Sequence, residues 1–136
     1  MASNAADYGY YRAQNSNKST TFAVAAADSA TKENVITAKN ANYTVFVQRI
    51  ILSVFADSAQ SLTFQDDAGT PVVIGKSAAS PGLGVEIVAD FGPEGYPLTE
   101  GKNLDITISG AGLACKGSIE AYERLTAVIA YTNANQ

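Results

Sequence analysis

The side chains that could carry out chemistry are mainly carboxylates, and they form three pairs: Asp66 with Asp67, Glu120 with Glu123, and Asp90 with Glu94. Paired carboxylates suggest a cation site or the acid and base of a glycosidase. A calcium loop needs ligands spread over about a dozen residues, so the stretch from Asp66 to Gly69 is interpreted as a hairpin turn. The chain has no tryptophan to stack on a sugar ring. We therefore expect no catalytic residues, no metal site and no cofactor.

A second chemical feature is the absence of histidine from the whole sequence. Histidine is the commonest general base near neutral pH and the commonest metal ligand. Its absence favours a scaffold whose surface is its function over an enzyme. Cys115 is the only cysteine, so no internal disulfide is possible and no oxidising compartment is required. Its place in a strand pattern predicts a small apolar residue of the core or of a sheet edge.

The charge balance bears on possible partners. The chain has 9 basic and 13 acidic side chains, and its formal net charge is -4. Its lysines and arginines are scattered singly, unlike the clusters that bind phosphate backbones. No segment approaches the roughly 20 apolar residues that span a bilayer, and the N-terminus lacks a secretion signal. We expect a soluble protein synthesised in a cytoplasm, with no nucleic acid, membrane or small-molecule partner.

Residues suited to protein binding lie near both ends of the chain. Residues 1–19 are polar apart from a cluster of interface candidates: Tyr8, Tyr10, Tyr11 and Arg12. Tyrosine and arginine are enriched at binding hot spots, so this segment is interpreted as an N-terminal arm that lies across its own domain or reaches a neighbouring subunit. Residues 126–136 are a final strand or a second contact arm, with three further interface candidates: Val128, Ile129 and Tyr131.

Between these arms, residues 20–125 contain runs in which apolar and polar residues alternate, the pattern of half-buried strands. The sequence predicts strands or hairpins over Thr20–Ala26, Lys32–Ala38, Tyr43–Phe55, Ser61–Ile74, Val85–Phe91, Leu104–Ile108 and Ala114–Leu125.

Two of these runs allow finer predictions. In Tyr43–Phe55 the apolar positions change phase at Gln48 and Arg49, and a structure of period two can change phase only at a bulge or bend. In Leu104–Ile108 the alternation places the leucine and isoleucines inward, and it places Asp105 outward.

Seven to nine short strands separated by turns, with no helical segment of normal length, predict an all-β sandwich or barrel. The expected architecture is an antiparallel β-sandwich with an extended N-terminal arm, and a jelly roll fits the number of strands best. The sandwich domain would span residues 20–125.

Four segments between Ile50 and Arg124 carry a likeness to a known family: Ile50–Val54, Leu62–Thr70, Asp90–Gly95 and Leu98–Ile106. Their layout resembles that of the jelly-roll decoration, or cement, proteins of tailed-bacteriophage heads. The resemblance implies a homotrimer on the outer capsid surface, bound to the major capsid protein and stabilising the head. It brings no catalytic residues.

One alternative function is a carbohydrate-binding or receptor-binding β module of a phage tail or fibre. Such a module would expose aromatic side chains around a shallow site, and Tyr96, beside the 93–97 loop, is the one clear candidate. Another alternative, a hydrolase, would need a pocket that brings two carboxylates together, and we expect none.

Overall fold

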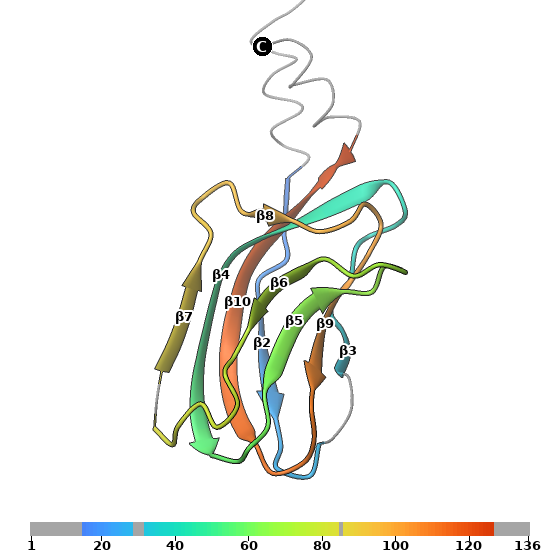
Figure 1. Cartoon of the computed structure of the whole chain (residues 1–136). Coiled ribbons are helices and arrows are strands. Elements are labelled where there is room, and N and C mark those ends of the chain that lie inside the picture. The colour runs from blue at the N-terminus through green and yellow to red at the C-terminus, as the bar shows by residue number, and fades with distance from the viewer. Residues whose placement is uncertain (1–14, 29–31, 85, 127–136) are drawn as a thin grey trace, which may run out of the picture.

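The computed structural model of the chain describes residues 15–28, 32–84 and 86–126, and these form two β-sheets packed face to face (Figure 1). All seven interface candidates named above lie outside the described residues. The strands are β1 (Ser16–Asn17), β2 (Thr20–Val24), β3 (Lys32–Ile36), β4 (Tyr43–Ala56), β5 (Leu62–Asp66), β6 (Val73–Lys76), β7 (Glu86–Asp90), β8 (Tyr96–Pro97), β9 (Leu104–Ile108) and β10 (Ala114–Leu125).

The strand pairing is nested. Sheet A has the order β1-β10-β4-β7, with β2 also paired to β10 and β8 to β4, and sheet B has the order β3-β9-β5-β6. Every pair is antiparallel: β2 with β10, β3 with β9, β4 with β7, and β5 with β6. These four nested pairs contain eight of the ten described strands and are divided between the two sheets, which is the arrangement of a jelly roll. The predicted antiparallel β-sandwich is confirmed, whereas residues 1–14 of the predicted N-terminal arm lie outside the described residues.

The predicted bulge in the longest strand is also confirmed. Along β10, Glu120 is paired with Arg49 but the next residue, Ala121, is paired with Val47, so Gln48 is left without a partner in the register. The extra residue shifts the alternation by one position. As a result Val45 and Val47 before it, and Ile50, Leu52 and Val54 after it, all face the core.

The core fills the space between the inward faces of the sheets. Phe22 of β2 and Phe64 of β5 meet edge to face across it, with ring centroids 5.7 Å apart. Gly117 of β10 lies where this packing is tightest, because a Cβ there would overlap the Ile51 carbonyl oxygen and crowd the Phe22 ring. The aliphatic side chains fully enclosed between the sheets include Val45, Val47, Leu62, Leu104, Ile106, Leu113 and Ile119.

Two predicted strands end earlier than expected. β2 stops at Val24 and not at Ala26, because the Ala25 N–H donates to the Asp28 carboxylate and the Asp28 N–H donates to the Ala25 carbonyl, which closes a turn. β3 stops at Ile36 and not at Ala38, because the Ala38 N–H donates to a side chain outside the sheet ladder, the Asn103 amide oxygen.

The prediction for Asp105 is wrong, since its side chain is buried. Its carboxylate accepts a hydrogen bond of 2.8 Å from the Asn34 N–H. The pairing of β3 with β9 is irregular between Lys32 and Ile36, and Asn34 has a positive φ of 57°. This irregular edge strand brings a backbone donor over Asp105. The alternation of β9 alone would leave the Asp105 side chain in solvent, but the neighbouring strand β3 covers it.

The stretch from Asp66 to Gly69 forms the predicted hairpin turn between β5 and β6. The buried Asp66 carboxylate accepts backbone hydrogen bonds from Ala68 (3.2 Å), Val72 (2.9 Å) and Thr99 (2.9 Å). Thr99 belongs to the loop between β8 and β9, so this one carboxylate ties two loops together.

Cys115 is fully buried in β10, as predicted from its strand position. Burial raises the pKa of its thiol from 9.0 to about 11. Since the thiolate is the reactive form, we expect the native protein at pH 8 to react with a thiol reagent about 100-fold more slowly than the unfolded chain. Absorbance after addition of an aromatic disulfide, with and without denaturant, measures this ratio. Equal rates would contradict the burial of this residue.

Candidate functional site at the junction of the chain ends

Both described ends of the chain lie at the same end of sheet A (Figure 1). β1 is paired with the last part of β10, so that Ser16 lies opposite Glu123 and Asn17 opposite Tyr122. We call this region the terminal junction, defined as residues 15–19, 38–44 and 122–126. It is the part of the body from which both predicted contact segments extend.

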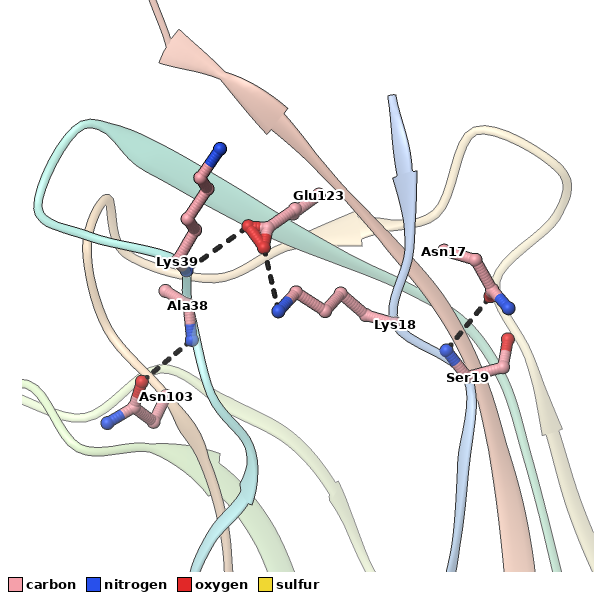
Figure 2. Close-up of polar contacts among 7 residues, drawn as sticks. All are labelled: Asn17, Lys18, Ser19, Ala38, Lys39, Asn103 and Glu123. Carbon is pink, nitrogen blue, oxygen red and sulfur yellow. Dashed lines mark hydrogen bonds and ion pairs between the residues drawn. The ribbon is translucent and has the colours of Figure 1, made fainter. Parts of the chain in front are cut away.

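A buried ion pair forms the centre of the terminal junction (Figure 2). Glu123 is 1% exposed, and its Oε1 lies 2.9 Å from the Lys18 Nζ, whose side chain is 28% exposed. The second oxygen, Oε2, accepts a 3.1 Å hydrogen bond from the backbone N–H of Lys39. Both oxygens of Glu123 are therefore engaged, one by the N-terminal segment and one by the loop between β3 and β4.

The N-terminal segment is held to β10 by its backbone as well. The Lys18 N–H donates to the Ala121 carbonyl at 2.8 Å. Ser19, at the break between β1 and β2, accepts the Ala121 N–H with its hydroxyl oxygen at 3.1 Å. The hydroxyl thus takes the place of a backbone acceptor where the strand is interrupted. This continuity keeps the Lys18 side chain aimed at Glu123.

Hydrogen bonds at the outer limits of the junction fix the last described residues. The Arg124 Nε donates to the Asn15 amide oxygen at 2.8 Å. On the other side, the hydroxyls of Thr126 and Thr44 are 2.9 Å apart, and the Thr126 N–H donates to the Asn42 carbonyl. The positions at which both predicted contact segments join the body are therefore set by specific contacts.

An aromatic cluster covers the outer face of sheet A beside the junction. The rings of Phe46 and Tyr122 are stacked, with centroids 5.0 Å apart and an interplanar angle of 7°. The Arg124 guanidinium lies 5.7 Å and 5.6 Å from these two rings. The Tyr122 hydroxyl donates to the Glu94 carbonyl at 2.7 Å. This cluster braces the end of β10 against β4 and the loop before β8.

The carboxylate pairs considered for catalysis are not arranged as catalytic pairs. Glu120 and Glu123 extend from opposite faces of β10, since Glu120 is exposed beside Arg49 and Glu123 is buried. The Asp90 carboxylate accepts the Gly92 N–H, which closes a turn. Within the described ranges no three acidic or cysteine side chains gather in a way that could hold a metal ion, and no helix there is long and apolar enough to cross a membrane.

A shallow pocket of about 330 Å³ lies on the outer face of sheet A, lined by Gln48, Arg49, Asp90, Gly92, Pro93 and Glu120. It brings together two carboxylates, those of Asp90 and Glu120, on the two strands that flank Arg49, so the expectation that no pocket would do so is wrong. Tyr96, the aromatic residue proposed for sugar binding, is 42% exposed but is not part of this lining. Its ring packs edge to face on Phe91 at 5.8 Å. The lining of this pocket therefore contains no aromatic side chain, and the carbohydrate-binding alternative stays a prediction.

The central contact of the junction, between Lys18 and Glu123, was not predicted, and Glu123 was considered only as half of a carboxylate pair. A signal for Glu123 was present, because the inward positions Ile119 and Ala121 continue with period two to position 123. A glutamate at an inward position indicates a buried charge that needs a partner. No comparable pattern marks Lys18, which lies in a polar stretch.

No protein-family model and no curated protein matches the chain. Among solved structures, the chain is similar to a pilus protein from Bacillus endospore appendages, with 11% identity, a TM-score of 0.43, and coverage of 82% of this chain and 90% of that one. It is also similar to a protein of the infectious bursal disease virus VP2 subviral particle, with 13% identity, a TM-score of 0.31, and coverage of 82% of this chain but 34% of that one. Both likenesses are to all-β structural proteins. Likenesses this weak transfer no residue, partner or activity to this chain.

Proposed function

We propose that this chain is a non-catalytic structural virion protein: a decoration, or cement, protein that is synthesised in the host cytoplasm and binds the outer surface of a phage head as a homotrimer. Its partner would be the major capsid protein. The observation that carries this proposal is the terminal junction. There the ion pair of Lys18 with Glu123 and the pairing of β1 with β10 hold together the positions at which both contact segments join the body.

The position of the junction supports binding through the N-terminal segment. Tyr8, Tyr10, Tyr11 and Arg12 lie within seven residues of Asn15, so all four attach within about 25 Å of one end of the body. Tyrosine and arginine side chains give large contact areas and hydrogen bonds at modest entropic cost. Weak contacts from three such segments on one trimer add up, because each further contact forms at high effective concentration.

Replacing Tyr8, Tyr10 and Tyr11 together with serine tests this function. We expect affinity for assembled heads, measured by co-sedimentation, to fall at least about tenfold. We expect the thermal unfolding midpoint to stay unchanged, which separates a loss of head binding from a loss of folding. Heads of the phage that encodes the chain, stripped of their decoration, are the binding partner.

The matched control is Tyr96→Ser, which removes an exposed tyrosine from the body. This variant should bind heads as the wild type does. If Tyr96→Ser loses head binding and the triple variant keeps it, the contact surface is the 93–97 loop and the proposed role of the N-terminal segment is wrong. A positive glycan array that Tyr96→Ser abolishes would favour the carbohydrate-binding alternative.

A further inference from the structure

The four edges of the two sheets differ in how open they are to another strand. β3 pairs irregularly with β9, and β6 pairs irregularly with β5. The edge formed by β1 and β2 is interrupted at Lys18 and Ser19. β7 is different, because all five of its residues pair in unbroken register with β4, and among the described strands β7 pairs only with β4. A regular, uncovered edge is a template for strand addition.

The exposure of its side chains and the direction of its backbone groups also suit β7 to pairing with an added strand. Its central residue, Val88, is 51% exposed, and Leu83, just before the strand, is 69% exposed. The Phe91 N–H donates to the Gln48 carbonyl of β4 at 2.8 Å. Because the donors of an antiparallel strand alternate between its two sides, the N–H and C=O of Val88 point away from β4. These groups at the uncovered edge (left in Figure 1) are placed to pair with an added strand.

The charges on β7 restrict what can bind there. Glu86 and Asp90 are exposed at either end of the strand. In an antiparallel pair of two β7 strands centred on Val88, each Glu86 would lie opposite an Asp90, and like charges directly opposite destabilise a sheet. The added strand must therefore be uncharged or basic.

One segment outside the described body fits these requirements. Residues 126–136 contain no charged side chain, and residues 127–131 read Ala-Val-Ile-Ala-Tyr, a run as long as β7 in which the valine, isoleucine and tyrosine are strand-forming residues. The N-terminal segment fits less well, because Asp7 would add to the negative charge and Gly9 weakens a strand.

The added strand must come from another copy of the chain. Leu125 is paired with Tyr43, whereas Val88 is paired with Ile51, eight residues farther along β4. That separation is about 26 Å. Tyr131 is five residues beyond Thr126 and can reach at most about 18 Å from it. Residues 127–131 therefore cannot lie beside Val88 of their own molecule.

We infer that copies of this chain join head to tail by strand addition, with residues 127–131 of one copy pairing with the uncovered edge of β7 in the next. A head-to-tail contact closes into a ring when its rotation allows, and a ring of three copies gives the homotrimer. The inference rests on the proposed function in that it supplies the contact that builds the trimer.

Two variants of the full chain test each side of this contact. Val88→Pro removes the outward N–H without removing a hydrogen bond to β4, since proline is tolerated at such an edge position. Its control is Val88→Thr, which keeps the N–H and the branched shape. Ile129→Asp places a negative charge against the acidic edge. We expect wild type and Val88→Thr to sediment as trimers, and Val88→Pro and Ile129→Asp to associate at least about tenfold more weakly.

A mixture of the two weakened variants gives the sharper result. Val88→Pro keeps its donor segment and Ile129→Asp keeps its acceptor edge, so an equal mixture should form a dimer with one copy of each and no larger ring. The inference is wrong if either variant alone forms trimers as the wild type does. It is also wrong if the mixture stays monomeric while the wild type is trimeric, or if the wild type itself is monomeric. Thermal unfolding checks that each variant folds. If Val88→Pro does not fold, the association of Ile129→Asp alone still tests the contact.

Head binding is a separate measurement and distinguishes the two proposals. If the variants behave as expected but the wild-type trimer does not bind heads, the strand addition stands and the proposed function fails. If heads bind a wild type that never forms trimers, the strand addition and the homotrimer are wrong, and only the decoration role of the proposed function stands.

Discussion

Replacing Lys18 with methionine is expected to lower the free energy of unfolding by about 3 kcal/mol. The substitution keeps the length of the side chain but leaves the Glu123 carboxylate, which is 1% exposed, without its ammonium partner 2.9 Å away. A buried charge without a partner is costly because it has lost its water and gained no compensating charge. Urea unfolding at pH 7, followed by circular dichroism, measures the change.

Lys39→Met is the matched control, because Lys39 contacts the same carboxylate through its backbone N–H and not through its ammonium group. The Lys39 Nζ lies 5.2 Å from the centre of the Tyr43 ring, an exposed contact worth about 0.5–1 kcal/mol. Adding Glu123→Gln to Lys18→Met should recover most of the lost stability, since no buried charge then remains. Equal losses for Lys18→Met and Lys39→Met would show that the ion pair does not hold the junction together.

Replacing Asp66 with asparagine should cost about 2–3 kcal/mol of stability. The Asp66 carboxylate is fully buried and accepts backbone hydrogen bonds from Ala68, Val72 and Thr99. An asparagine side chain offers one oxygen in place of two, and its NH₂ group would face donors. Thermal and urea unfolding measure the loss. Asp67→Asn is the control, because its exposed carboxylate bonds only to Asn103 among the contacts seen, and it should cost less.

The same residue gives stability a pH dependence. Burial by itself raises the pKa of Asp66, but the hydrogen bonds from Thr99, Val72 and Ala68 outweigh it and hold the pKa below the ordinary value of 3.8. A carboxyl group whose pKa is lower in the folded state stabilises the fold fully above its unfolded pKa, and this stability is lost as the pH falls through the folded value. Between about pH 5 and pH 2, the wild type should therefore lose more stability than Asp66→Asn. Parallel curves would contradict this assignment.

The strand pattern of the body was predictable because each inward position is set by burial against the opposite sheet. The alternation at Leu104, Ile106 and Ile108 and the phase change at Gln48 both appear in the structure. The errors occur where a polar contact from another element decides the outcome. Asp105 is buried by an irregular neighbouring strand, and the ends of β2 and β3 are set by turns and by Asn103.

The candidate site was less predictable than the fold. The tyrosines and the apolar residues of the two contact segments were recognisable by type, and their roles stay predictions. The partnership of Lys18 with Glu123 was not recognisable, because 105 residues separate them and only the pairing of β1 with β10 brings them together. Periodicity reports which face a residue occupies, but it does not report which distant residue meets it there.

The nested pairing of the strands has a consequence for synthesis. Val24 of β2 pairs with Cys115 of β10, so β2 emerges from the ribosome about 90 residues before its partner, an interval of roughly 5–20 s at usual elongation rates. During that interval Phe22 and Val24 have no sheet to cover them. The nascent chain therefore completes its outermost strand pair last, and its yield in the cell depends on protection from aggregation until translation reaches β10.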